Sequence, residues 1–166
     1  GLNLPGPDMT SRLAPHLHFG EIGPQQIAWM LESGVHEKSA EGPRAAAELF
    51  LRELGWREFS HHLLYHFPHT PLQNLNPKFD VFHWADDAGE MTARWQRGAT
   101  GIPIVDAGMR QLWKSGWMHN RVRMIVASFL TKNLRQHWRH GARWVWETLG
   151  DAELANTRQG GQGTAG

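Results

Sequence analysis

The chain has 166 residues, enough for one domain with a core of its own, and a formal net charge of +1 at pH 7. It contains no cysteine, which excludes disulfides and thiolate metal sites. No apolar run approaches the length of about 18 residues that a membrane-spanning helix needs. Nine tryptophans are unusual, because a buried indole N–H needs a partner. Packing explains most of them, and base stacking and electron relay are the functional alternatives.

The positive charge is concentrated in residues 91–146, which hold ten Lys or Arg residues and one acid, Asp106. This stretch carries +9, so the rest of the chain carries −8. A strongly basic segment in a nearly neutral chain indicates an anionic partner, most often nucleic acid. A solvated helix face is the structural alternative.

Taken in chain order, apolar periodicity and the positions of proline and glycine predict helices separated by loops. Residues 1–9 and 67–84 are expected to be loops. Thr10 or Ser11 is expected to cap a first short helix. No segment has the alternation of a strand, so the predicted fold class is all-α. The other predicted helices cover, in order, residues 24–34, 43–66, 88–97, 103–115, 120–137 and 143–149.

Glu53, Trp56 and Arg57 fall on one face of the long predicted helix, because they are three and four residues apart. An acid, a flat aromatic ring and a guanidinium together offer hydrogen bonding, stacking and phosphate pairing. The structural alternative is an ion pair of Glu53 with Arg57 beside a core tryptophan, and this is the more common meaning of such a pattern.

A second group lies in the segment GWMHNRVRM. On a helix, Asn120, Arg123 and Met124 share a face, and Arg121 points elsewhere. An asparagine both donates and accepts, which suits the edge of a heterocycle. Arg123 adjoins apolar residues and is expected to need a buried acid, for which Asp151 and Glu153 are the candidates, either beside a cofactor or as a purely structural pair.

A third group lies in MTSRLAPHLHFGEI, residues 9–22. Consecutive hydroxyls and an arginine before a helix can hold a phosphate through N–H groups and the helix dipole, although a simple helix cap is more common. The 11 histidines form no metal-ligand pattern with carboxylates, so no metal site is predicted.

In this order the segments resemble the flavin-binding domain of the photolyase/cryptochrome family, from about residue 9 to about residue 155. TSRLAPHLHFGEI resembles the family's flavin-phosphate segment, and ELGWREF its dimer-contact helix. TGIPIVDAGMRQL and NRVRMIVASFLTKNLRQHWR match its most diagnostic stretches nearly throughout, and DAELA matches the start of its flavin-edge segment. Several long motifs in one order are far more specific than one short motif.

The resemblance implies a partial FAD-binding helical domain over residues 1–156, a divergent or disordered tail over 157–166, and an N-terminal α/β antenna domain outside this chain. It implies FAD as the cofactor and DNA containing pyrimidine dimers as the partner. The implied FAD contacts are Thr10, Ser11, Arg12, Leu13, Ala14, Arg57, Asn120, Arg123, Asp151, Ala152 and Glu153. The residues implied to face DNA and a flipped-out dimer are Glu53, which is also implied to be catalytic, Trp56, Arg57, Asn120, Arg121 and Met124. Trp138 and Trp84 resemble the middle and outer members of the family's tryptophan electron relay.

The implied activity is light-driven repair, in which excited reduced FAD donates an electron to a cyclobutane pyrimidine dimer and the ring opens. His119, Asn120 and Met124 resemble class I enzymes for cyclobutane dimers, because enzymes for the (6-4) lesion typically carry further histidines at the last two positions. The alternatives are a cryptochrome-type blue-light receptor and a flavin-free remnant that binds DNA by charge. A cytoplasmic monomer without membrane contact is expected.

The resemblance fails after residue 155. In a gapless alignment Thr157 replaces an asparagine at the flavin N5 edge, Gly161 replaces the flavin-proximal relay tryptophan, and Gly163 replaces a tryptophan of the dimer pocket. A shift by one residue restores Asn156 to the asparagine position but restores neither tryptophan. A fragment with a boundary error is the favoured explanation, and poor photoreduction of oxidised FAD is the expected consequence.

Overall fold

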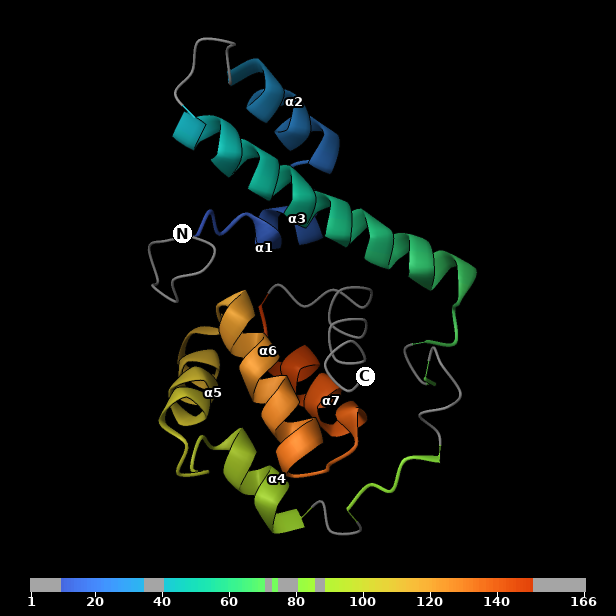
Figure 1. Ribbon diagram of the computed structural model, residues 1–166, viewed down its shortest axis with the longest axis vertical. Helices are drawn as coiled ribbons and strands as arrows, with labels where there is room; N and C mark the ends of the chain where they lie inside the picture. Colours follow the sequence, from blue (N-terminus) through green and yellow to red (C-terminus); the bar gives the residue numbers. More distant parts are fainter. Residues whose placement is uncertain (1–9, 35–40, 71–72, 75–80, 86–88, 151–166) are drawn as a thin grey trace.

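The computed structural model describes residues 10–34, 41–70, 73–74, 81–85 and 89–150. The regular elements within these ranges are helices, which confirms the predicted all-α class. Figure 1 shows a layer of three helices above a bundle of the others. The layer comprises α1 (Ala14–His18), α2 (Pro24–Gly34) and α3 (Glu41–His66). The bundle comprises α4 (Gly89–Gln96), α5 (Pro103–Ser115), α6 (Asn120–Ser128), a π-helical turn η2 (Phe129–Asn133) and α7 (Trp138–Thr148).

The bundle has one continuous hydrophobic core to which each of its helices contributes. The core residues are Trp95, Val105, Met109, Leu112, Met118, Val122, Val126, Leu130 and Leu149. The indole N–H of Trp95 donates to the carbonyl oxygen of Val126 at 3.0 Å, close to the point where α6 passes into the π-helical turn. The buried indole is therefore satisfied, as burial of a polar group requires.

Two glycines allow the bundle helices to approach closely. A Cβ on Gly108 of α5 would lie 2.5 Å from Val122 of α6, and one on Gly141 of α7 would lie 2.6 Å from Leu130. These distances are far shorter than a van der Waals contact between carbon atoms. Gly141 falls between the predicted helices at 120–137 and 143–149, but it lies inside α7, where its missing side chain leaves room for Leu130.

The layer buries much less apolar surface than the bundle. In α2 and α3 the buried apolar side chains are Ile27, Ala47 and Leu54, whereas Trp29, Trp56 and Tyr65 are exposed among several others. No helix in the described ranges is long and apolar enough to cross a membrane.

The helix boundaries agree best with the sequence where proline and glycine mark them. The predicted helices at 24–34 and 103–115 have the observed bounds, and the long helix begins at Glu41 and ends at His66. The expected cap by Thr10 or Ser11 is wrong, because Leu13 is the N-cap of α1 and makes no side-chain cap bond. The helix predicted over 120–137 ends at 133, and α7 begins five residues earlier than the predicted start at 143.

Two arginines outside the helices have a left-handed backbone. Arg12 has φ 53° and Arg135 has φ 52°. This conformation is unfavourable for a residue with a Cβ and is usually adopted by glycine or asparagine. Strain of this kind concentrates at functional sites, so both positions bear on the candidate site.

Candidate cofactor and nucleic-acid site

The N-terminal end of α6 is the part of the bundle that lies toward α1 and α3 (Figure 1). The helix begins at Asn120 because the buried imidazole of His119 acts as its cap, with Nδ1 accepting a hydrogen bond from the Arg121 N–H at 3.1 Å. No acid occurs in the first turn. The helix dipole and the two arginines at 121 and 123 therefore make this end attractive to an anion.

Within this first turn the predicted residues have different environments. Asn120 and Arg121 are exposed, and Arg123 is half-buried. The Nε of Arg123 donates to the carbonyl oxygen of Met118 at 2.8 Å, which fixes the direction of the side chain. The expected pairing of Arg123 with a buried acid stays a prediction, because Asp151 and Glu153 lie outside the described residues.

The predicted phosphate segment lies next to this helix end. The guanidinium carbon of Arg12 lies 5.6 Å from the ring centroid of Trp117, so the segment TSRL contacts the loop that precedes α6. The Oγ of Ser11 accepts from the Leu13 N–H at 3.4 Å. The Oγ1 of Thr10 is buried and has no hydrogen-bond partner among the described residues. A buried hydroxyl without a partner is costly, so an anionic oxygen is a fitting acceptor for it.

The three predicted residues of α3 present a mixed surface. Trp56 is 59% exposed and meets Phe59 edge to face, with ring centroids 5.9 Å apart. The structural alternative of a core tryptophan is therefore wrong. Glu53 is exposed. Arg57 forms an ion pair with its neighbour Glu58, with Nη1 and Oε1 2.7 Å apart.

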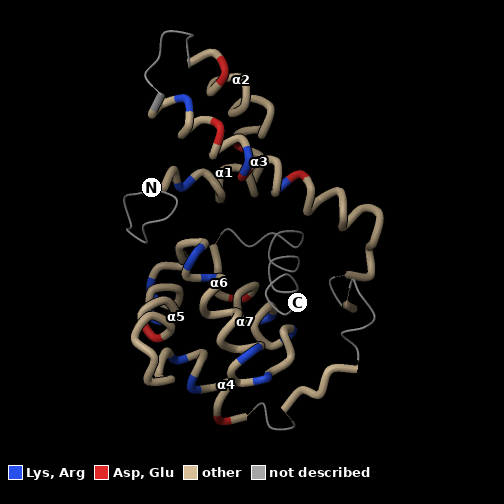
Figure 2. The backbone as a smooth tube through the Cα atoms, in the orientation of Figure 1, with Lys and Arg blue, Asp and Glu red and all other residues tan. Residues whose placement is uncertain are grey.

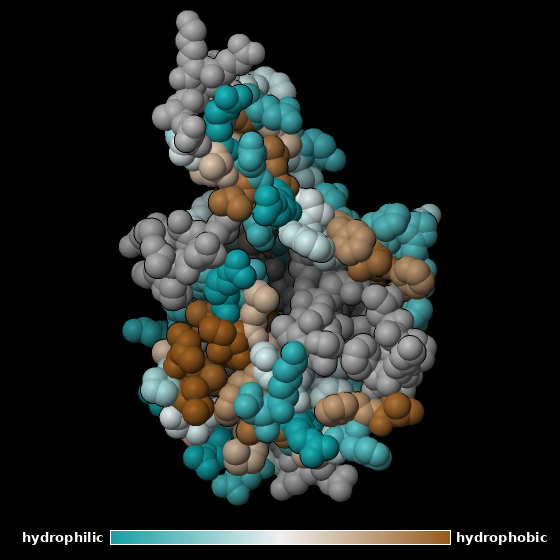
Figure 3. Space-filling view, viewed as in Figure 1, coloured by the Kyte–Doolittle hydropathy of each residue, from teal (hydrophilic) through white to brown (hydrophobic). Residues whose placement is uncertain are grey.

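Met124 of α6 lies beside a shallow apolar groove of about 480 Å³. Figure 3 shows apolar residues gathered on the face over α5 and α6. Met124 is 45% exposed, so its side chain is available to a ligand. The groove is lined by Ile102, Val105, Met124, Ile125, Ser128, Phe129, Lys132 and Asn133.

The charges of the layer and the bundle differ in sign. Figure 2 shows most of the described Lys and Arg residues on α4–α7, whereas several acids lie on α2 and α3. In the bundle Arg143 pairs with Glu147, with Nε and Oε1 2.9 Å apart. The basic stretch predicted from the sequence therefore belongs mainly to one compact part of the molecule.

Asp106, the one acid of that stretch, is a structural residue. Its Oδ1 accepts from the Thr100 N–H at 2.8 Å and from the Thr100 hydroxyl at 2.6 Å, and its Oδ2 accepts from the Gly101 N–H at 2.9 Å. Burial acts to raise the pKa of Asp106, but these hydrogen bonds and the charge of Arg110 outweigh it and lower the pKa. The carboxylate thus locks the loop before α5, a role that sequence reasoning missed.

Of the two predicted relay tryptophans, Trp84 lies in the segment before α4, and Trp138 is the first residue of α7. Trp138 is 2% exposed, and its indole N–H donates to Oδ1 of Asn74 at 2.7 Å. The ring of His137 contacts both indoles, with centroid distances of 4.9 Å to Trp84 and 5.6 Å to Trp138. Sequence reasoning missed Asn74 and His137, because neither stands in a pattern that points to a distant partner.

The remaining predicted residues lie outside the described ones. This applies to Asp151, Ala152, Glu153, Asn156, Thr157, Gly161 and Gly163. The pairing of Arg123 with Asp151 therefore stays a prediction. The last described residue, Gly150, donates its N–H to the Gly116 carbonyl oxygen at 2.9 Å, next to the loop that leads into α6.

The comparisons of this chain with known proteins agree on one family. The family described as the FAD binding domain of DNA photolyase matches residues 50–166. A deoxyribodipyrimidine photo-lyase of Agrobacterium fabrum is 48% identical over 166 residues, covering 100% of this chain and 34% of that protein. Cryptochrome-2 of Arabidopsis thaliana is 44% identical over 154 residues, covering 87% of this chain and 24% of that protein.

A solved structure is also similar. The crystal structure of a bacterial class III photolyase from Agrobacterium tumefaciens superposes with a TM-score of 0.92 at 47% identity, covering 100% of this chain and 33% of that chain. The chain therefore spans about a third of the length of the photolyases that it matches.

Proposed function

We propose a light-driven DNA-repair function for this chain, which belongs to the DNA photolyase family through its FAD-binding domain. The chain binds FAD noncovalently. It forms part of an enzyme that uses light to repair cyclobutane pyrimidine dimers. The observation that carries the proposal is the contact of Arg12 with Trp117. This contact places the hydroxyls and arginine of TSRL beside the positive end of α6, where a pyrophosphate and a flavin edge find complementary groups.

The residues at this end fit FAD in different ways. The buried Oγ1 of Thr10 and the guanidinium of Arg12 are suited to phosphate oxygens. Asn120 is suited to the edge of the isoalloxazine ring, since it donates and accepts. Arg123 is suited to pair with Asp151 beside the cofactor. When bound in its reduced form, FAD supplies the electron that opens the dimer.

The surface of α3 and α6 fits the substrate. Trp56 offers an exposed indole face on which a flipped-out base can stack, and Met124 offers an apolar contact. Glu53 is proposed to hydrogen-bond the dimer, and Arg121 to contact the phosphate backbone. The basic bundle supplies the sequence-independent attraction to DNA.

The test begins with flavin binding. The purified protein is reconstituted with FAD, and the bound flavin bands are recorded for the parent, Arg123→Ala and Lys114→Ala. The parent and Lys114→Ala should retain flavin, and Arg123→Ala should bind it more weakly, because it removes the proposed partner of the Asp151 carboxylate. Absence of flavin bands in the parent would contradict the proposal. Repair of dimer-containing DNA with chemically reduced flavin then tests the activity.

A cryptochrome-type receptor is the second candidate, because Cryptochrome-2 of Arabidopsis thaliana is 44% identical to the chain. Exposure of Trp56 and Met124 favours repair, since these side chains suit a dimer. A repair assay compared with light-dependent binding of a protein partner distinguishes the two. The enzyme class belongs to the proposal as well: the residue pattern favours class I, whereas the similar solved structure is a class III photolyase.

Three further properties are part of the same proposal. The protein works as a monomer. The family's N-terminal domain binds an antenna chromophore. The protein acts in the cytoplasm. Size-exclusion chromatography of the DNA-free protein tests the first of these.

A further inference from the structure

We propose that the turn at Arg135–His137 joins Trp84 to Trp138 for electron transfer. Arg135 is the positioning residue that holds Trp84 in place, and the imidazole of His137 is the bridge between the two indoles. This inference rests on the proposed function, because the relay serves to reduce a bound flavin. It concerns residues to which neither the family resemblance nor the comparisons assign a role.

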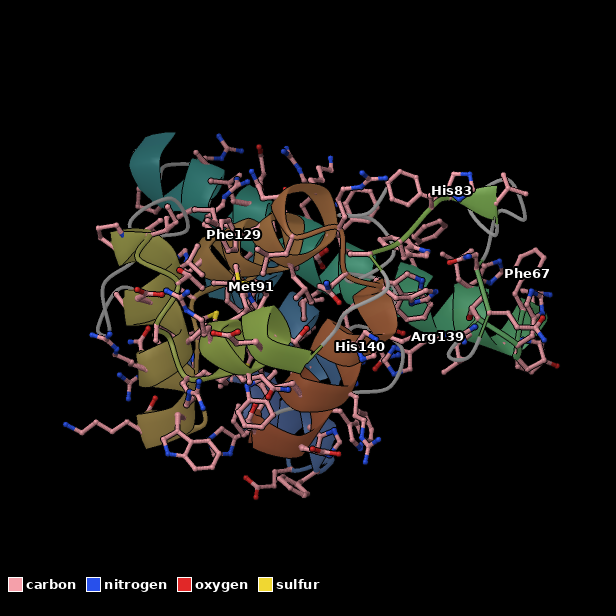
Figure 4. All side chains as sticks on the ribbon, turned by 90° about the horizontal axis from the view of Figure 1, so that it is seen from below. Phe67, His83, Met91, Phe129, Arg139 and His140 are labelled. Carbon is pink, nitrogen blue, oxygen red and sulfur yellow. The ribbon has the colours of Figure 1, made fainter. Side chains whose placement is uncertain are left out.

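Arg135 fastens the segment that carries Trp84 at several points. Its carbonyl oxygen accepts from the Ala85 N–H at 2.8 Å. Its guanidinium Nη2 donates to the carbonyl oxygen of His83 at 3.0 Å, and its guanidinium carbon lies over the ring of Phe82, 6.0 Å from the centroid. Figure 4 shows His83 on the segment before α4 and Arg139 at the start of α7. The residues on both sides of Trp84 are thus held by one arginine.

The backbone of Arg135 supports this role. Its φ of 52° lies in the left-handed region, where glycine or asparagine is the usual residue. An arginine at such a position does not stabilise the turn itself. Its guanidinium contacts with the segment at 82–85 offset the cost of the unfavourable conformation.

His137 and Trp138 are held as firmly as Trp84. The Nδ1 of His137 accepts from the Arg139 N–H at 3.2 Å and caps α7, so the imidazole has a fixed orientation. Trp138 is fixed by burial and by its hydrogen bond to Asn74. The imidazole is tilted by 47° to Trp84 and by 37° to Trp138. The imidazole therefore contacts both the buried indole and the half-buried one.

The step on this path is a single-electron transfer. If a bound flavin took one electron from Trp138, Trp84 would pass one electron to the Trp138 radical cation. Trp138 is restored, and Trp84 becomes the radical cation that an external reductant reduces. No bond forms or breaks between the two indoles, and no proton needs to move. The electronic coupling between two groups weakens steeply with the distance across which no atoms intervene. An imidazole that contacts both indoles therefore speeds electron tunnelling between them.

Four variants separate the bridge from a structural role. Arg135→Gly keeps the left-handed turn and its carbonyl but removes the guanidinium. His137→Asn keeps a side-chain acceptor for the cap of α7 and removes the ring, whereas His137→Phe keeps a ring and removes the acceptor. Arg97→Asn removes an exposed arginine of the same basic stretch and serves as the control.

The first measurement needs no flavin. Ring-proton contacts between Trp84 and His137 are recorded by NMR in the flavin-free protein. The contact should be present in the parent and in Arg97→Asn, and it should be lost in Arg135→Gly. Its persistence in Arg135→Gly would overturn the positioning role of Arg135. This result stands whether or not the chain binds FAD, so it separates failure of the inference from failure of the proposed function.

The second measurement follows electron transfer by flash photolysis of FAD-loaded protein in a Gly161→Trp background, which supplies the flavin-proximal indole. His137→Asn and Arg135→Gly should lose stable flavin reduction several-fold, and His137→Phe and Arg97→Asn should behave like the parent. A purely structural cap predicts the reverse order for the two His137 variants. Equal rates in His137→Asn and the parent, or a slower His137→Phe, would overturn the bridge.

Discussion

The bundle α4–α7 encloses many more large apolar side chains than the layer α1–α3, although both regions also expose some. In the bundle Trp95, Met109 and Trp138 are almost completely enclosed, whereas in the layer Trp29, Trp56 and Tyr65 face outward. Burial of a large apolar side chain contributes roughly 1.5–3 kcal/mol, so the bundle holds most of the folding free energy. The difference indicates that the bundle contributes more to the stability of the fold than the layer does.

The largest expected effect concerns Met109 of the bundle, which is 0% exposed. Met109→Ala should lower the free energy of unfolding by about 2–5 kcal/mol, because it removes buried apolar contacts and leaves a cavity. The matched control is Met30→Ala in the layer, whose side chain is exposed and whose change should stay within about 0.5 kcal/mol. Urea unfolding measures both. Equal losses would remove the distinction between the two regions.

The next effect concerns two glycines with different surroundings. A Cβ at Gly108 of the bundle meets Val122 at 2.5 Å, whereas one at Gly55 of α3 meets nothing within 4 Å. Gly108→Ala should destabilise the protein by about 1–3 kcal/mol through overpacking. Gly55→Ala should stabilise it by about 0.5–1 kcal/mol, because alanine restricts the unfolded chain and favours the helix. Thermal unfolding of the two variants decides whether the bundle alone is tightly packed.

Trp56 provides the converse test, in which binding changes and stability does not. Trp56→Ala should weaken binding of dimer-containing DNA by about 1–3 kcal/mol, the usual loss for one base-stacking aromatic. Its unfolding midpoint should match that of the parent, since the indole is largely exposed. Fluorescence anisotropy with damaged and undamaged DNA measures the effect. A loss of stability without a loss of affinity would assign Trp56 to packing.

Acid should affect the bundle through Asp106. Because the folded-state pKa lies below the ordinary value of 3.8, the ionised carboxylate contributes stability that is fully present above that value. This stability is lost as the pH falls through the folded-state pKa. Asp106→Asn should therefore unfold more easily near neutral pH and should lack this part of the acid dependence. A parent and variant with parallel profiles below pH 3.8 would contradict the role of the carboxylate.

The smallest structural change is expected from salt, which should act on DNA binding and leave the fold intact. Affinity should fall as salt rises, with a slope that follows the number of phosphates neutralised by the basic bundle. Lys132→Gln should reduce the slope of log affinity against log salt concentration by about 1, the value for the loss of one phosphate contact. Glu48→Gln, on the acidic layer, is the control and should leave the slope unchanged. A flat salt response would remove the charge argument.

Sequence alone determined the features that depend on neighbours within one turn of helix. The bounds of α2 and α5 follow from Pro24 and Pro103 at their starts and from glycines at their ends. Helical spacing likewise placed Glu53, Trp56 and Arg57 on one element. These signals are local, because capping and periodicity act over three to four residues.

Tertiary structure decided which segments meet. Whether Trp56 faces solvent, whether Gly141 ends a helix or admits Leu130, and which loop residue accepts from Trp138 all depend on parts of the chain far apart in sequence. The same holds for Arg135, whose left-handed turn ends the predicted helix early because its contacts lie at residues 82–85. A local sequence pattern does not predict such contacts, because burial and packing depend on the whole fold.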